Sequence, residues 1–378
     1  MKVARLRRRI LAVNRRFRQA QMIATALKSP RRPILAHLVP IRRCNLSCAY
    51  CNEHDDFSQP VPTAVMLGRV DLLAALGTIT ITISGGEPLL HPELEGIVRR
   101  IRGHNIIASV LTNGHLLNPE RIKRLNRAGL DALQISIDNV LPDETSKKSL
   151  AVLDQKLQWL AEHAEFEVIT NSVLGASIRN ADDVPVIARR ARELGFTHTI
   201  GILHDQHGQL EPPDGEQQQR AYAEITQFRD SVYGLAYYNY FQKNLIRGLP
   251  NDWHCHAGCR YLYVCEDGLV HYCSQRRGCP GIPLEQYTRE DLERHYQTVK
   301  PCAPYCTISC VHQVGMIDFL RERPQEALAR FFPAREKQHS RADLPVMFRA
   351  LAWVFLPSKP NSKRRLLAKA ALRLLGVS

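Results

Sequence analysis

Several features of other protein classes are missing from this chain of 378 residues. It has no low-complexity segment and no secretory signal with an apolar centre. It also has no apolar run of the roughly 20 residues that a membrane-spanning helix needs. The hydrophobic content of 44% therefore predicts a folded protein with one large core or two smaller ones.

Acidic residues are absent from both ends of the chain. Residues 1–32 contain eleven Lys and Arg, residues 344–378 contain seven, and neither segment contains Asp or Glu. The two segments carry +18, so the remaining residues carry −4 if the net charge is +14. A nucleic-acid enzyme needs basic residues around the reacting nucleotide. We therefore expect no nucleic-acid partner.

The eleven cysteines are grouped in short spacings typical of metal sites, and with no secretory signal we expect a reducing, cytoplasmic compartment. Cys44, Cys48 and Cys51 form a C-x3-C-x2-C array directly after the apolar run 36–41. Three thiolates can hold three irons of a [4Fe–4S] cluster and leave the fourth iron open for chemistry. The alternatives are buried cysteines or a zinc loop, although structural zinc takes four ligands and the sequence offers no fourth nearby.

A second motif follows the apolar, β-branched run 78–84, which ends in Gly85-Gly86-Glu87-Pro88. Two glycines allow the backbone to approach a ligand closely, and Pro88 fixes the turn that leaves the strand. Glu87 is suited to an ammonium group. The motif predicts a ligand site at the end of this strand.

Both motifs, together with Tyr50 before the last cysteine, resemble those of the radical SAM enzymes. The resemblance implies that S-adenosylmethionine (SAM) chelates the open iron and that Gly85 and Gly86 bind its amino end. It also implies an electron donor of the flavodoxin or ferredoxin type. The expected reaction is cleavage of SAM to methionine and a 5′-deoxyadenosyl radical.

Between residues 34 and 205, strand-like runs alternate with helical stretches, which predicts a parallel sheet. The resemblance covers this region and implies a partial (β/α)6 radical SAM barrel. We expect an α/β protein in which this barrel is followed by a small cysteine-rich auxiliary-cluster domain and terminal amphipathic helices. The expected strands are 36–41, 78–84, 106–112, 132–138, 166–171 and 197–203; the expected helices are 119–128, 150–163 and 183–194.

In such a barrel, the residues at the carboxyl ends of the strands face the cofactor. Asn113 and Asn171 lie at two of these ends and are expected to bind the cofactor. Ser136 and Asp138 are candidates for the ribose hydroxyls; the alternative is that they cap the next helix. Residues 139–148 depart from the His-Asp…Arg turn of many relatives, so the role of that turn does not carry over.

A second cysteine region begins with Cys255, Cys259 and Cys273 around Gly268 and resembles the opening of SPASM and twitch auxiliary-cluster domains. A predicted hairpin, 261–264 and 269–272, returns the last of these cysteines towards the first two. We expect at least one auxiliary [4Fe–4S] cluster in a domain at 251–322, with structural zinc as the alternative. Cys265 and Cys279 are interpreted as packing thiols. The remaining candidate ligands are Cys302, Cys306 and Cys310.

The three remaining segments are assigned from composition. Residues 1–33 predict a basic amphipathic helix on an anionic membrane; the alternatives are a helix packed on the body and a transit peptide. Residues 206–250 are interpreted as a linker and a bridging helix. Residues 323–378, which include Trp353 and Phe355, predict a helical, basic segment at the inner face of the membrane.

The terminal segments lead to a functional hypothesis: a radical SAM enzyme that modifies an unactivated carbon of a membrane lipid or other apolar substrate. One alternative is a SPASM-type maturase of a precursor peptide. Such maturases often carry a winged-helix domain before the barrel, for which 35 residues are too few. The other alternative is a non-catalytic iron–sulfur electron carrier, which the Gly85-Gly86-Glu87-Pro88 motif does not favour.

Overall fold

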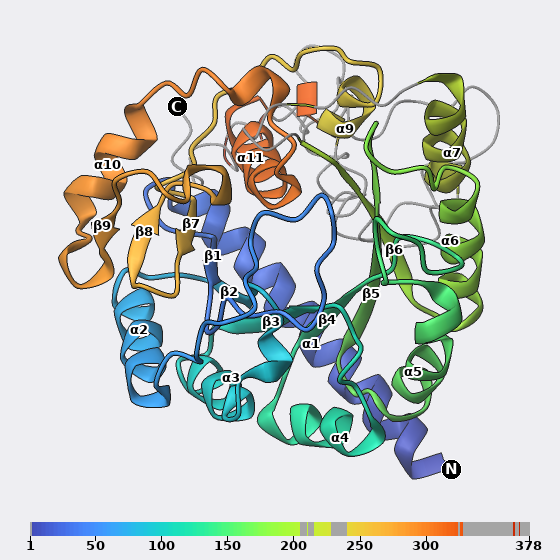
Figure 1. Ribbon diagram of the computed structural model, residues 1–378. Helices are drawn as coiled ribbons and strands as arrows, with labels where there is room; N and C mark the ends of the chain where they lie inside the picture. Colours follow the sequence, from blue (N-terminus) through green and yellow to red (C-terminus); the bar gives the residue numbers. More distant parts are fainter. Residues whose placement is uncertain are drawn as a thin grey trace.

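The computed structural model describes residues 2–204, 210, 215–227, 240–323, 326–327, 366 and 370. In these residues, nine strands form one sheet in the order β6-β5-β4-β3-β2-β1-β7-β8-β9 (Figure 1). Strands β1 to β7 are parallel, and β8 and β9 are antiparallel. The strands are β1 Leu35–Leu38, β2 Thr80–Ile83, β3 Ile107–Thr112, β4 Ala132–Ser136, β5 Glu167–Leu174, β6 Thr197–Ile202, β7 Tyr261–Val264, β8 Leu269–His271 and β9 Ile282–Pro283. The predicted α/β fold with a parallel barrel sheet is confirmed.

The helices between the first six strands lie on the outside of the sheet (Figure 1). Helix α4 follows from local signals: the Asn118 side chain accepts a hydrogen bond from the N–H of Arg121, Pro119 opens the helix, and Gly129 ends it at φ +82°. Two helices, α2 and α3, were not assigned from the sequence. The helices of the barrel are α2 Thr63–Ala75, α3 Leu94–Gly103, α4 Pro119–Ala128, α5 Leu150–His163 and α6 Asp183–Glu193.

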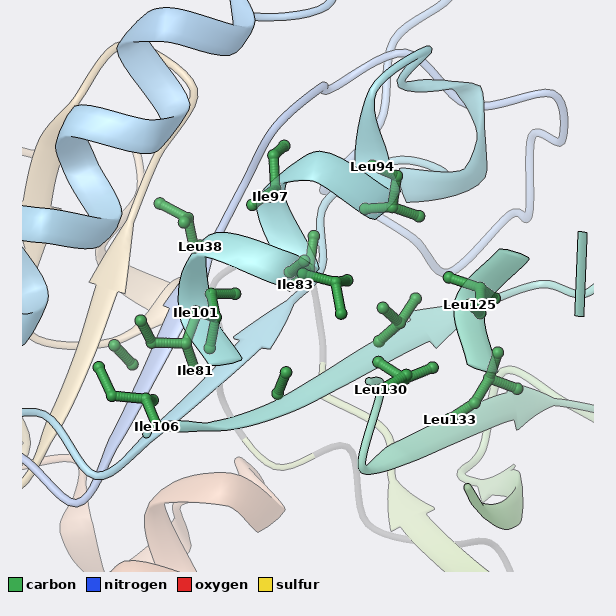
Figure 2. Close-up of a cluster of buried hydrophobic side chains, with 14 of the residues drawn as sticks. Leu38, Ile81, Ile83, Leu94, Ile97, Ile101, Ile106, Leu125, Leu130 and Leu133 are labelled. Atoms are coloured by element: carbon green, nitrogen blue, oxygen red, sulfur yellow. The ribbon is translucent and has the colours of Figure 1, made fainter. Parts of the chain in front are cut away.

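The main core lies between the sheet and these outer helices. Alternate residues of β1 and β2 point towards α3, where Leu38, Ile81 and Ile83 are fully buried near Leu94 and Ile97 (Figure 2). Burying an aliphatic side chain of this size contributes about 1.5–3 kcal/mol. The other face of the sheet is more polar, since neighbouring strands place His37, Thr82 and Ser109 in register there.

The cysteine-rich hairpin belongs to the same sheet as the barrel. Strand β7 pairs in parallel with β1, so that Leu35 lies opposite Tyr261 and Leu38 opposite Val264. Arg69 of α2 holds the turn of the hairpin, because its Nη1 donates to the carbonyl oxygens of Cys265 and Glu266 at 3.3 and 3.0 Å. The predicted hairpin therefore forms, and it extends the barrel sheet beyond β1.

Helix α1 (Lys2–Lys28) crosses the edge of the sheet where the strands begin (Figure 1). Arg15 donates to the carbonyl oxygen of Glu165, and Arg18 pairs with Asp131, which precedes β4. This side of α1 therefore packs on the body, as one of the alternatives expected, and membrane binding by the helix stays a prediction. Val13 and Phe17 remain on the exposed side.

The C-terminal end of α1 is fixed by one buried arginine. Arg260 is 0% exposed and donates to the carbonyl oxygens of Ala26, Ser29 and Arg32 at 2.6–2.9 Å. Its guanidinium also pairs with the buried carboxylate of Asp318 at 2.8 Å. Arg260 therefore joins α1, the start of β7 and the helix that carries Asp318, α11 (Ser309–Glu322).

The other described helices are α7 Gly215–Gln227, α9 Tyr240–Leu245 and α10 Arg289–Gln297. Parts of the predicted linker lie outside the described residues, and so does the predicted C-terminal segment at 323–378 apart from residues 323, 326, 327, 366 and 370. No helix in the part of the chain that the structure describes is long and apolar enough to cross a membrane.

We predict that Arg260→Met lowers the free energy of unfolding by roughly 3–5 kcal/mol, because Asp318 is left as a buried charge without its main partner. Urea unfolding followed by circular dichroism measures this change. The control is Arg189→Gln, which removes an exposed ion pair with Glu224 and is expected to cost about 0–1 kcal/mol. Equal effects of the two substitutions would contradict the prediction.

Candidate active site

The first three cysteines lie on a loop that leaves the carboxyl end of β1 and closes on itself. The N–H of Cys44 donates to the carbonyl oxygen of Asp55 at 3.0 Å, and the N–H of Cys51 donates to that of Cys48 at 3.0 Å. Burial raises the pKa of Cys44 and raises that of Cys51 to about 11, with Cys48 contributing charge repulsion to both. The three thiols are therefore neighbours, as the spacing predicts.

Gly85 and Gly86 lie directly against the backbone of this loop. A Cβ at Gly86 would collide with the carbonyl oxygens of Arg42 and Arg43, and one at Gly85 would lie 2.5 Å from that of Ile41. The N–H of Gly86 donates to the carbonyl oxygen of Ile41 at 3.1 Å. The two glycines were expected to let the backbone approach a ligand. In the structure they let it approach the start of the cysteine loop.

Glu87 does not offer a free carboxylate to an ammonium group, which corrects the expectation from the sequence. It is 0% exposed and accepts from the Thr112 hydroxyl at 2.7 Å and from the N–H groups of Asn113 and Leu89 at 2.8 and 2.9 Å. Burial raises its pKa despite these donors. Its role in the structure is to join the ends of β2 and β3, and Pro88 begins the short 3-10 helix η1 (Pro88–Leu90) after it.

Asn113 returns from the end of β3 to the cysteine loop. Its Nδ2 donates to the Asn45 side chain at 2.8 Å and lies 3.6 Å from the Cys44 sulfur. Asn113 is therefore at the predicted site and touches one of the predicted iron ligands.

Asp138 fixes the other side of the loop. Its carboxylate is fully buried and accepts from the Tyr50 hydroxyl at 2.5 Å and from the Ser146 hydroxyl at 2.8 Å, and it pairs with the Lys148 ammonium at 3.1 Å. Ser146 also lies 3.8 Å from the Cys48 sulfur. Asp138 and Tyr50 are thus brought together as expected, but they bind each other.

Lys148 and Ser146 were missed by the sequence analysis. Lys148 donates to the Tyr50 hydroxyl and lies 4.9 Å from the centre of its ring. Although burial opposes the charge, Asp138 and Tyr50 hold the pKa of Lys148 well above its usual value. The sequence held one signal for Lys148: residues 139–148 differ from the turn of many relatives, and they contain a lysine after β4.

Ser136 and Asn171 occupy neighbouring strands in register, away from these contacts. The Thr199 hydroxyl donates to the Asn171 side chain at 2.7 Å. The alternative that Ser136 and Asp138 cap the next helix does not hold, because the residue before α5 is Ser149. A ribose role for Ser136 stays a prediction.

Four cysteines of the second region form a group of their own. Burial raises the pKa of Cys306 well above its usual value, and the charges of Cys255, Cys273 and Cys302 raise it further. The same causes raise the pKa of Cys255 to about 11 and that of Cys273 to about 12. These four thiols are neighbours: Cys255 precedes β7, Cys273 follows β8, and Cys302 and Cys306 lie on the segment before α11.

Cys259 packs in a different core cluster from Cys255 and Cys273, and its assignment as a ligand stays a prediction. Its side chain is 0% exposed in the main core, and burial raises its pKa to about 12 with Asp318 and Glu293 as the nearby acidic groups. Cys310 packs against the core cluster that contains Cys255 and Cys273. Burial raises its pKa to about 12, and Glu53 of the first cysteine loop is the acidic group beside it.

The thiols at both places have the chemistry of iron–sulfur ligands, because a [4Fe–4S] cluster binds each thiolate to a different iron. At the first place Cys48 lies near both Cys44 and Cys51. At the second, Cys255, Cys273 and Cys302 lie near Cys306. Four thiolates suit zinc as well, so structural zinc stays an alternative at the second place.

Residues 38–204 match the family model described as the radical SAM superfamily. The chain therefore contains a radical SAM domain. Members of the family use a [4Fe–4S] cluster and SAM, and the matched residues contain Cys44, Cys48, Cys51 and the strand ends described above. The structure identifies residues beside these cysteines that the motif does not specify, among them Ser146 near Cys48 and Asn113 near Cys44.

Several curated relatives share part of this chain. The PqqA peptide cyclase of Gluconobacter oxydans is 36% identical over 117 residues, which are 30% of this chain and 32% of the relative. That of Granulibacter bethesdensis is 26% identical over 66% of this chain and 69% of the relative. The GTP 3′,8-cyclase of Synechococcus is 35% identical over 41% of this chain and 50% of the relative. The chain thus spans between a third and about two thirds of these relatives.

Solved structures share the fold at low sequence identity. SuiB of Streptococcus suis bound to the precursor peptide SuiA has a TM-score of 0.54 and 12% identity, over 78% of this chain and 74% of SuiB. The enzyme anSMEcpe, with bound AdoMet and a peptide, has a TM-score of 0.51 and 15% identity, over 79% of this chain and 96% of the other. These matches cover a larger share of the chain than residues 38–204 make up.

We predict that Gly86→Ala abolishes iron binding at the first three cysteines, because the new Cβ must push the loop away from the end of β2. Iron is counted after anaerobic reconstitution, in a background that lacks Cys306 so that the second site does not contribute. Gly103→Ala is the matched control, since a Cβ there meets nothing within 4 Å. Full iron content in the Gly86 variant would contradict this account.

We also predict that substitution distinguishes the cysteines that bind iron at the second site from a cysteine that only packs in the core. In a background without Cys44, Cys48 and Cys51, Cys306→Ala and Cys273→Ala are expected to lose about four irons per chain. Cys259→Ala is expected to keep them, because its thiol packs in the core. Iron analysis and the absorbance of the cluster measure both outcomes, and loss of iron with Cys259→Ala alone would return that residue to the ligand set.

Proposed function

We propose that this protein is a radical SAM enzyme that modifies a peptide. The observation that carries the proposal is the second group of four cysteines. Two of them flank the hairpin that extends the barrel sheet, and two lie before α11. A SAM-cleaving barrel on its own does not need a second cluster site. Relatives named PqqA peptide cyclase, and a fold shared with SuiB, support the choice of a peptide.

The expectation of a lipid substrate receives less support. It rested on the basic terminal segments, and one side of α1 packs on the barrel. The relatives and structures named above act on or bind peptides or a nucleotide, as their names state. The precursor-peptide alternative is therefore the better interpretation, and an electron donor remains necessary for SAM cleavage.

Cys44, Cys48 and Cys51 would hold the first cluster, and Cys255, Cys273, Cys302 and Cys306 the second. When bound, the first cluster supplies the electron that cleaves SAM to methionine and the 5′-deoxyadenosyl radical. This chain's residues position the reactants.

Lys148 brings a positive charge beside the Cys48 loop, where it suits the carboxylate of SAM. Asp138 and Tyr50 hold its ammonium in place. Asn113 orients the Cys44 side of the loop. These contacts pre-organise the loop before any ligand binds, which lowers the cost of binding.

The proposal predicts two products in one experiment. Reconstituted protein, SAM and dithionite are incubated with each short peptide encoded beside its gene, and 5′-deoxyadenosine and peptide masses are measured. One peptide is expected to change mass in step with 5′-deoxyadenosine formation, and Cys48→Ala is expected to give neither product. SAM cleavage that is stimulated by GTP or by lipid, with every peptide unchanged, would overturn the choice of substrate.

A further inference from the structure

The side of α1 that faces away from the barrel has an apolar stripe. The Val13 and Phe17 side chains are 63% and 64% exposed, and Ala24 is exposed as well. Spacings of four and eleven residues put these three on one line along a helix. In the sequence, Leu6 and Ile10 continue the same spacing.

The barrel does not cover this stripe. The contacts of α1 with the start of the sheet come from Arg15, Arg18, Gln19 and Met22. At 3.6 residues per turn, these positions lie on the opposite side of the helix from Val13 and Phe17. In Figure 1, the N-terminal end of α1 also extends beyond α4 and α5 at the edge of the molecule.

The charge of α1 indicates which kind of molecule would bind its outward face. The helix contains nine Lys and Arg and no acidic residue. Arg15 and Arg18 bind the barrel, and the seven other basic residues favour an anionic partner. The apolar residues of 344–356 are poor candidates for covering the stripe, because residues 344–378 carry seven basic residues and no acid. A bilayer with anionic headgroups supplies negative charge and an apolar layer together, whereas nucleic acid supplies only the charge.

We propose that the outward face of α1 binds an anionic lipid surface, with Val13 and Phe17 inserted between headgroups. The inward face keeps the helix on the barrel at the same time. This binding is independent of the peptide chemistry, because α1 lies at the edge where the strands begin and the cysteine loop lies where β1 ends.

The test uses the full-length protein and flotation with phosphatidylcholine vesicles, prepared with or without phosphatidylglycerol, at low and at physiological salt. The protein is expected to float only with phosphatidylglycerol, and less of it as salt rises. Val13→Asn/Phe17→Asn is expected to weaken binding by about tenfold, because the apolar contact is lost.

The control is Val152→Asn/Val186→Asn, which removes two valines that are 43% and 37% exposed on α5 and α6. It is expected to bind as the wild type does, and circular dichroism confirms that both double variants are folded. The proposal is overturned if the wild type fails to float with phosphatidylglycerol at low salt, or if the α1 variant binds as tightly as the control. Displacement of the vesicles by equimolar duplex DNA would also overturn it and indicate a nucleic-acid face.

Discussion

The contact between the Gly85-Gly86 backbone and the carbonyl oxygens of residues 41–43 is the constraint on which the candidate site depends. Only glycine permits this approach, and it fixes where the cysteine loop leaves β1. Glu87 accepts a hydrogen bond from the N–H of Asn113, and the Asn113 side-chain amide donates to Asn45 in the cysteine loop. The loop is therefore positioned by the ends of three strands, so its own sequence does not have to be rigid.

The other side of the loop is held by charge. Asp138 has no exposed surface, and three donors share one of its oxygens. A buried carboxylate is stable only when it is paired and hydrogen-bonded, so the Lys148 ammonium and the Tyr50 hydroxyl are needed for folding as well as for the site. The same groups thus serve local stability and the placement of a ligand.

The sequence predicted best where the signals are local. Helix α4 has a cap, a first-turn proline and a terminal glycine within twelve residues, and its bounds were predicted correctly. The pairing of β7 with β1 joins residues more than 200 positions apart, and the separation of Cys259 from the other thiols depends on which side of a turn faces the core. Spacing does not encode either fact, because tertiary packing decides both. Lys148 was missed for a related reason: its partners come from two other segments.

The β1–β7 pairing has a consequence for function. The first cysteine loop leaves the end of β1, and Cys273 follows the hairpin that β7 begins. Backbone hydrogen bonds join the two strands, among them the N–H of Val39 to the carbonyl oxygen of Val264 at 3.0 Å. The distance between the two cysteine groups is therefore set by a sheet, not by the long connection between β6 and β7.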